Sequence, residues 1–160
     1  MKHQVALPLL VVLVLLPAFS FGRQGKVVGV SDGDTITVLH DGKGEKIRVY
    51  GIDCPEKGQD FGQKAKMFTS DKVFGKIVEI DPVTTDRHGR TVALVFFGGG
   101  QNLSEELVDE GYAWVYRKYC SKPRCSLWLE LEERARTNKV GLWSLPNPIP
   151  PWDYRKKPGS

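Results

Sequence analysis

Two segments rich in β-branched residues, joined by a glycine-containing turn, constrain the fold of this chain more than any other feature. Thr35–Leu39 and Lys46–Tyr50 largely alternate apolar with polar side chains, a pattern typical of strands with one buried face. Asp41-Gly42-Lys43-Gly44 lies between them and is a strong hairpin signal. The sequence therefore predicts an antiparallel hairpin, and we expect His40 to pair with Glu45.

Three further strands are expected outside the hairpin. Val27–Val30 opens the β-rich half of the chain, and Lys76–Ile80 forms a strand that Pro82 should stop. Thr91–Phe97 is the last clear strand, and the three glycines at 98–100 end it. Five short strands in so small a chain favour a small barrel.

Three segments have the apolar spacing of helices, two of them in the second half of the chain. Gln63–Val73 predicts one helix with a narrow apolar stripe, and Asn102 has the chemistry to cap a second helix that continues through Glu105. Ser126 is expected to cap a third that ends near Asn138. We predict an α+β domain built on a five-stranded OB-fold β-barrel with about three helices.

The first 22 residues are typical of a secretory signal peptide. A positively charged start precedes an apolar run from Val5 to Phe19, and Ala18 and Ser20 have the spacing of a cleavage site. The run is shorter than the roughly 20 apolar residues that span a bilayer. We predict cleavage near residue 22, a domain over residues 23–145, and export to the periplasm or the medium. The alternative is an uncleaved segment that anchors the protein to the membrane.

The C-terminal end is rich in proline and in positive charge. The whole sequence has a formal net charge of +4, and loss of Lys2 with the signal peptide leaves 22 basic and 19 acidic residues. This excess permits attraction to a polyanion without requiring it. Residues 146–160 hold five prolines, four of them within residues 146–151, and the basic run Arg155, Lys156 and Lys157. We predict an extended, poorly ordered basic tail.

The cysteines provide a second argument, after the signal peptide, that the protein is exported to an oxidising compartment. Cys120 and Cys125 are separated by four residues, Pro123 among them, in a segment predicted to be a loop. In an oxidising compartment they form a natural disulfide pair. A zinc site is the rival interpretation, but neither His40 nor His88 is near in sequence. Cys54 is left unpaired.

Carboxylates are predicted to converge at one end of the hairpin. Asp32-Gly33-Asp34-Thr35 alone indicates only a turn before a strand. In the expected pairing, however, Asp34 lies opposite Gly51, so it approaches Asp53 and Glu56 at the same end of the ribbon. Like charges repel in a partly desolvated cleft, and a bound cation relieves that repulsion. Oxygen donors without a nearby histidine select calcium or magnesium over zinc.

Arginines complete the candidate chemistry. Thr84–Arg90 predicts a turn that leads into a strand. Arg48 and Arg90 carry planar guanidinium groups that grip a phosphate through paired hydrogen bonds, which lysine cannot imitate. Two arginines, a divalent cation and a free carboxylate are the parts needed to hydrolyse a phosphodiester.

These motifs together resemble the thermonuclease (staphylococcal nuclease) family in their order and approximate spacing. The resemblance is carried by Asp32-Gly33-Asp34-Thr35, by Arg48 with Asp53-Cys54-Pro55-Glu56, by Thr85-Asp86-Arg87-His88-Gly89-Arg90, by Glu110-Gly111-Tyr112-Ala113 and by Gly141-Leu142-Trp143-Ser144. It covers roughly residues 26–144. It implies an OB-fold barrel with three helices and a calcium-dependent endonuclease that acts on DNA and RNA, leaving 3′-phosphate and 5′-hydroxyl ends.

The resemblance also implies a role for each matched residue. Asp34 and Asp53 are expected to bind Ca²⁺ together with the main-chain carbonyl of Cys54. Arg48 and Arg90 are expected to bind and polarise the scissile phosphate. Glu56 is the expected general base, acting on water or ordering it.

Some positions depart from the family pattern. Cys54 stands where the best-known member has threonine, and the stretch after Glu56 is shorter than that member's mobile loop. His88 replaces a nucleotide-contacting tyrosine. Further expected substrate contacts are Arg87, His88, Tyr116 and Tyr119; the two tyrosines can stack on a base or serve in packing.

The main rival function is a non-catalytic OB-fold domain that binds nucleic acid, because this fold often binds without cutting. A degenerate relative would be expected to lose a catalytic carboxylate or arginine, whereas Asp34, Arg48, Asp53, Glu56 and Arg90 are all present. The sequence therefore favours the enzyme. DNA and RNA are the expected partners, and we expect a monomer.

Overall fold

The computed structural model describes residues 22–156, so the predicted signal peptide lies outside the described residues except for Gly22. The strands are β1 (Arg23–Asp32), β2 (Thr35–His40), β3 (Lys43–Val49), β4 (Ile52–Asp53), β5 (Ile77–Thr85), β6 (Thr91–Phe97), β7 (Gln101–Asn102) and β8 (Trp114–Val115). The helices are α1 (Gly62–Val73), α2 (Leu103–Asp109), α3 (Arg124–Thr137) and α4 (Pro151–Tyr154), with two 3-10 turns at Arg117–Tyr119 and Gly141–Ser144.

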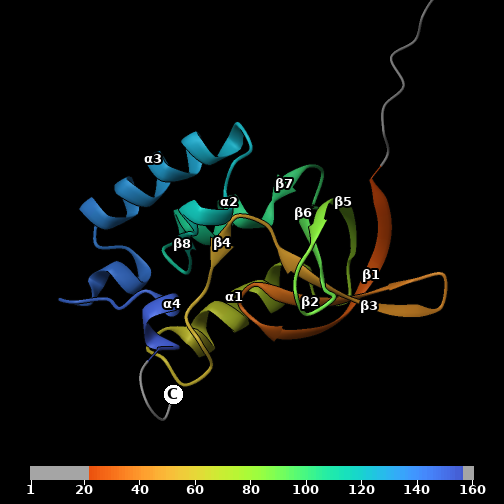
Figure 1. Ribbon diagram of the computed structural model, residues 1–160, viewed down its shortest axis with the longest axis horizontal. Coiled ribbons are helices and arrows are strands. Elements are labelled where there is room, and N and C mark those ends of the chain that lie inside the picture. The colour runs from red at the N-terminus through yellow and green to blue at the C-terminus, as the bar shows by residue number, and fades with distance from the viewer. Residues whose placement is uncertain (1–21, 157–160) are drawn as a thin grey trace, which may run out of the picture.

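Five strands close into a barrel. Their order is β3-β2-β1-β5-β6, and a parallel pairing of β3 with β6 closes the circle. Figure 1 shows the barrel on one side of the molecule, with α1 to α4 gathered on the other. The predicted α+β OB-fold barrel is confirmed. Its interior is filled by small and branched side chains, namely Val27, Ile36, Val38, Ile47, Val49, Val78, Ile80, Ala93 and Val95.

The hairpin of β2 and β3 is present, but its register differs from the one we expected. Asp41 and Gly42 form a two-residue turn with φ of 48° and 76°, and His40 pairs with Lys43 rather than with Glu45. Positive φ at both positions is the geometry that the right-handed twist of a tight hairpin requires. The turn uses the first glycine of the segment, which shifts the pairing by two residues and leaves the same side chains facing the core.

Two other predicted boundaries were wrong. β5 continues through Pro82 to Thr85, because the ladder to β6 is irregular between Pro82 and Thr84 and tolerates a residue without an amide hydrogen. α3 begins at Arg124, so Ser126 lies inside the helix rather than capping it. The cap of α2 is as predicted, since the Asn102 side chain accepts a hydrogen bond from the Glu105 amide.

A disulfide joins Cys120 to Cys125 just before and at the start of α3, with a Cα–Cα distance of 5.7 Å. The predicted pairing is therefore present in the structure. Cys54 is the free cysteine of the described residues and is buried.

The C-terminal tail is folded onto the domain, so the prediction of an extended, poorly ordered tail was wrong for residues 146–156. Pro151 starts α4 and is buried. The ring of Trp152 stacks on Tyr116, with centroids 4.9 Å apart and an angle of 13° between the ring planes, and meets Trp114 edge-on at 5.7 Å. Aromatic burial holds this segment in place.

None of the helices within residues 22–156 has the length and hydrophobicity needed to cross a bilayer.

Candidate active site

Three short segments bring the candidate catalytic residues together. Asp34 lies in the turn between β1 and β2, and its carbonyl accepts a 2.8 Å hydrogen bond from the amide of Val49 at the end of β3. Arg48 precedes Val49, whereas Asp53 belongs to β4, only a few residues further along. The end of the hairpin therefore lies next to the segment that carries Asp53 and Glu56, as the sequence predicts.

Arg48 joins the two expected metal-binding carboxylates. Its Nη1 lies 2.6 Å from Asp34 Oδ1, and its Nη2 lies 2.8 Å from Asp53 Oδ1. The Arg48 side chain is 14% exposed. Burial alone would lower the pKa of Arg48, but Asp34 and Asp53 outweigh it and raise that pKa. The arginine is therefore held as a cation between two buried anions, where an unpaired charge would be costly.

A third carboxylate crowds the turn. Asp32 Oδ1 accepts a 3.1 Å hydrogen bond from the Asp34 amide. Burial, and then the neighbouring Asp34 charge, raise the pKa of Asp32 to about 6. Burial and a like charge both raise carboxyl pKa values in this way, so the neutral form of Asp32 is favoured in the turn.

The main chain of Cys54 faces the site, and its thiol faces the core. The Cys54 amide donates a 2.6 Å hydrogen bond to Asp34 Oδ2. A Cβ placed on Gly33 would lie 2.8 Å from Cys54 Sγ and 2.9 Å from the Ala65 Cβ, so the thiol fills the space that Gly33 leaves. Burial, followed by Asp34, raises the pKa of the thiol well above its usual range. A neutral thiol in this position is a packing group.

The donor set fits a hard divalent cation. The expected ligands are the Asp34 and Asp53 carboxylates and the Cys54 carbonyl, all oxygen. Within residues 22–156 no group of three or more His, Cys, Asp or Glu side chains is spaced to hold a metal, so two carboxylates and one carbonyl would rely on water or substrate for further ligands. Arg48 Nη1 is buried, and its partner in the described residues is the Asp34 carboxylate, as an ion pair at 2.6 Å rather than a hydrogen bond of good geometry.

Arg90 is held at the edge of the same cluster. Its Nε donates a 2.7 Å hydrogen bond to Asp86 Oδ2, and its Nη1 lies 3.5 Å from Thr35 Oγ1, next to Asp34. Asp86 Oδ1 accepts the amides of both His88 and Arg90. Burial alone would raise the pKa of Asp86, but these hydrogen bonds outweigh burial and lower that pKa. Asp86 thus shapes the turn between β5 and β6 that aims Arg90, a role that the sequence did not single out.

The expected substrate contacts are less close to the carboxylates. Arg87 and His88 are exposed on that turn, and Arg87 Nε donates to His88 Nε2 at 3.1 Å. Tyr116 has one face covered by Trp152 and meets the ring of Tyr119 edge-on at 4.8 Å. Tyr119 is 56% exposed, so of the two tyrosines it has the freer surface.

Sequence reasoning missed one residue of the cluster. Arg155 lies 2.8 Å from Asp53 Oδ2 and 2.6 Å from Glu56 Oε1 through its two Nη atoms. It comes from the tail that the sequence placed outside the domain. Pro150-Pro151 ahead of an aromatic-rich segment, with Pro151 at the first position of α4, was the available signal of a docked helical turn.

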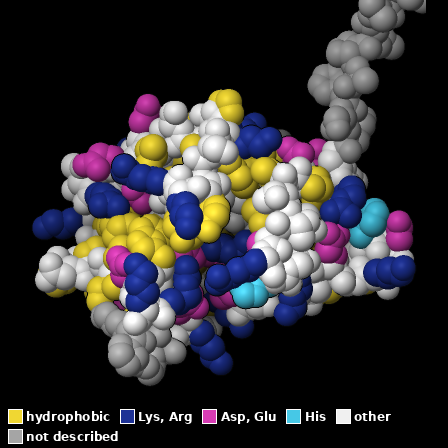
Figure 2. Space-filling model, viewed as in Figure 1, with side chains coloured by type: hydrophobic (Ala, Val, Ile, Leu, Met, Phe, Trp, Pro, Cys, Tyr) yellow, Lys and Arg dark blue, Asp and Glu magenta, His cyan; other side chains and the backbone are white. Residues whose placement is uncertain are grey.

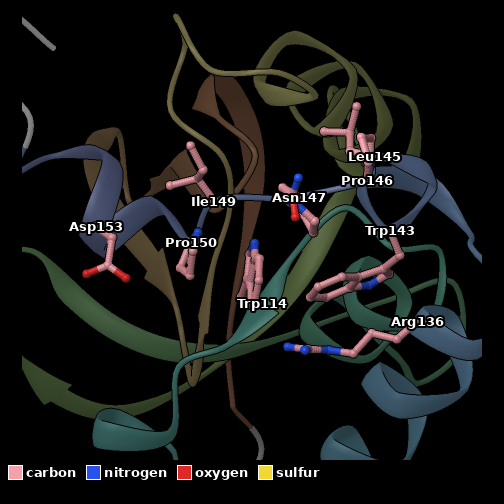
Figure 3. Close-up of a pocket in the computed structure, with 10 residues that line it drawn as sticks. Trp114, Arg136, Trp143, Leu145, Pro146, Asn147, Ile149, Pro150 and Asp153 are labelled. Carbon is pink, nitrogen blue, oxygen red and sulfur yellow. The ribbon is translucent and has the colours of Figure 1, made fainter.

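The hollow beneath the tail lies apart from the carboxylates. Figure 3 shows Trp114, Trp143 and Arg136 facing the chain from Leu145 to Pro150. The Arg136 guanidinium lies 4.0 Å from the ring centre of Trp143 and 4.8 Å from that of Trp114. None of the candidate catalytic residues lines this hollow. The residues that line this hollow indicate that it holds the C-terminal tail against the domain and is not a catalytic site.

Lys and Arg side chains gather on the face shown in Figure 2, between the barrel and the helices, with acidic side chains partly covered among them. A closed barrel that collects carboxylates and arginines at one end is suited to phosphodiester chemistry. The protein is a phosphodiesterase of the endonuclease class.

The chain belongs to the staphylococcal nuclease family. The family described as staphylococcal nuclease homologue matches residues 46–145. The chain is 40% identical to a micrococcal nuclease of Shigella flexneri, covering 91% of this chain and 87% of the relative. It is also 40% identical to an uncharacterized endonuclease of Haemophilus influenzae, covering 93% and 83%, and 35% identical to endonuclease Htp3 of Saprolegnia parasitica, covering 84% and 76%. Nucleic acids are the substrates of this family, whose members depend on a metal ion.

Proposed function

We propose that this protein is an exported, calcium-dependent endonuclease that hydrolyses DNA and RNA and leaves 3′-phosphate ends. The observation that carries the proposal is the placement of Arg48 between Asp34 and Asp53 at distances of 2.6 and 2.8 Å, with Glu56 on the loop that directly follows. Calcium is the proposed ion because the donors are oxygens in an irregular set, which calcium tolerates better than magnesium.

Each side chain has a distinct part in the proposed reaction. Asp34, Asp53 and the Cys54 carbonyl would hold the cation, which supplies positive charge beside the scissile phosphate when bound. Arg48 and Arg90 donate hydrogen bonds to the phosphate oxygens and stabilise the charge that develops on them. Glu56 accepts a proton from the attacking water.

The products follow from the bond that breaks. Water adds its oxygen to phosphorus, and the bond from phosphorus to the 5′ oxygen breaks. The phosphate stays on the 3′ oxygen, and the leaving 5′ oxygen takes up a proton to become a hydroxyl group. None of the groups in this scheme acts on the sugar or the base, which supports cleavage of both DNA and RNA.

Export rests on the character of residues 1–22, and the Cys120–Cys125 bridge supports it because disulfides persist in oxidising compartments. The destination is the periplasm or the medium, or the membrane surface if the segment stays uncleaved. All the groups of the proposed site come from one chain, in keeping with a monomer.

The test is to incubate the purified mature protein with plasmid DNA and with RNA, first in calcium and then in excess chelator. Cleavage should require the ion and should be faster with calcium than with magnesium. The ends should become substrates for a terminal transferase only after phosphatase treatment. Full cleavage in excess chelator, or binding without cleavage under every condition, would refute the proposal.

A further inference from the structure

The C-terminal tail reaches into the candidate active site through one side chain. Arg155 Nη2 donates a 2.8 Å hydrogen bond to Asp53 Oδ2, and Arg155 Nη1 donates to Glu56 Oε1 at 2.6 Å and to Asp53 Oδ1 at 3.3 Å. A single planar guanidinium therefore connects a carboxylate of β4 to one on the following loop. This fork geometry is specific to arginine.

Charge neutralisation alone does not account for Arg155. Asp53 is 2% exposed and already has an ion pair with Arg48. Because Arg48 already neutralises the charge of the Asp53 carboxylate, a second arginine there adds little further neutralisation. What Arg155 adds is the connection to Glu56, whose side chain is 38% exposed and pairs with no other cation in the described part of the chain.

The tail also fixes the loop on which Glu56 lies. The Tyr154 hydroxyl donates a 3.1 Å hydrogen bond to the Gly58 carbonyl. The Gln59 side chain donates to the Ile149 carbonyl of the tail and accepts the Glu56 amide at 3.1 Å. The tail therefore contacts this loop at Ile149 and Tyr154 as well as at Arg155.

The tail itself is anchored and is not a loose end. Trp152 of the tail stacks on Tyr116 and meets Trp114 of β8 edge-on, and Figure 3 shows Ile149 and Pro150 lying beside Trp114. Figure 1 places α4 beside the chain that leads from β4 to α1. The family match ends at residue 145, so this contact comes from outside the matched region.

We propose that Arg155 is a positioning residue of the nuclease site, which holds Glu56 and Asp53 in the arrangement that hydrolysis requires. The inference rests on the proposed function. Arg155 acts through the two carboxylates and does not itself contact the substrate. Its loss therefore has two opposite effects. Glu56 loses its orientation, which slows turnover, while a cation near Asp53 loses a positive neighbour and binds more tightly.

The test compares Arg155→Gln and Arg155→Lys with Lys156→Gln. Lys156 is a matched control because it is the next tail residue, carries the same charge, and contacts Asp153 at the surface rather than the site. For each protein, kcat and KM are measured on an oligonucleotide with saturating calcium. The calcium dissociation constant is measured by calorimetry without nucleic acid.

We expect Arg155→Gln to lower kcat at least tenfold with KM within threefold of the wild-type value, and to bind calcium about tenfold more tightly. Arg155→Lys keeps the charge but lacks the fork, so calcium affinity should return to within threefold of the wild-type value while kcat stays low. Lys156→Gln should match the wild type in all three quantities. Near-ultraviolet circular dichroism of the tryptophans shows whether the tail stays docked.

A kcat for Arg155→Gln within twofold of the wild-type value would overturn the proposal, as would an effect on KM alone, which would make Arg155 a substrate ligand. If Arg155→Gln releases the tail, Tyr154→Phe decides the matter. That variant removes one bond to the loop without changing charge, and it should lower kcat and leave calcium affinity unchanged. If the wild type does not cleave, the proposed function fails. Calcium binding still tests Arg155 in that case, and an unchanged calcium affinity in Arg155→Gln refutes its proposed role.

Discussion

The main-chain amide of Cys54 donates a 2.6 Å hydrogen bond to Asp34 Oδ2, while the thiol of the same residue lies against Gly33 in the core. Backbone and side chain of Cys54 therefore have separate tasks. The backbone connects the turn that carries Asp34 to the segment that carries Asp53. The side chain fills space and stays protonated, because burial raises its pKa.

Replacing the thiol should leave the chemistry intact. We expect Cys54→Ala and Cys54→Thr to keep calcium-dependent cleavage within roughly tenfold of the wild-type rate, or about 1.4 kcal/mol in the barrier. Cys54→Ala should lower the free energy of unfolding by about 1–2 kcal/mol, because it leaves a small cavity. The measurement is cleavage rate against calcium concentration. Two folded variants that are both inactive at saturating calcium would show that the thiol takes part in the reaction.

Arg90 is expected to matter for its shape as well as its charge. Arg90→Lys keeps the cation but loses the fork that Asp86 orients, so turnover should fall on the order of 100-fold. Substrate affinity should change less, since the lost contact strengthens as charge develops on the phosphate. Arg134→Lys on the surface of α3 is the control. Near-normal kcat for Arg90→Lys would place Arg90 outside the reacting centre.

The Cys120–Cys125 bridge should contribute modestly to stability. It closes a short loop, for which the chain-entropy model gives about 2 kcal/mol. The double variant Cys120→Ser, Cys125→Ser should lower the free energy of urea unfolding by that amount, and reduction of the wild type should have the same effect. Mass spectrometry of non-reduced peptides from exported protein gives the direct check, in which two free thiols would contradict the pairing.

Local sequence patterns predicted most strands of the barrel, but they did not predict the register of the hairpin formed by β2 and β3. Asp41-Gly42-Lys43-Gly44 contains two glycines, and a tight turn can use either, so the pattern did not determine the register and the expected pairing of His40 with Glu45 was wrong. Asp34 and Asp53 lie close together, as predicted, even though the hairpin register was wrong. The reason is that Gly51, with φ of 74°, turns the chain back after β3. A Cβ there would lie 2.8 Å from Cys120 Sγ and from the Trp128 ring.

Contacts between distant parts of the chain were beyond the sequence. Arg155 and Asp53 are 102 residues apart, and nothing in the local composition of the tail points to a carboxylate. Asp86 was overlooked for a different reason, because its role is to accept amides within its own turn. Motifs therefore predicted the residues that would carry the chemistry, whereas the residues that orient them depended on tertiary packing.

Asp32 makes the stability of the cation-free protein depend on pH. Burial and Asp34 raise its pKa to about 6 from an ordinary value of 3.8, so the folded protein binds this proton more tightly than the unfolded chain. The resulting stabilisation is present below about pH 4 and is lost as the pH rises through 6.

Asp32→Asn removes this titration, since an amide resembles the neutral acid at every pH. In chelator, the free energy of unfolding of the wild type relative to Asp32→Asn should fall by about 2 kcal/mol between pH 4 and pH 7. Urea unfolding of both proteins across that range provides the measurement, and titrating groups that do not interact with Asp32 cancel in the difference. Calcium should shrink the change, because a nearby cation favours the charged form of Asp32. A difference that stays constant from pH 4 to pH 7 would mean that Asp32 titrates normally and that the turn is not crowded with charge.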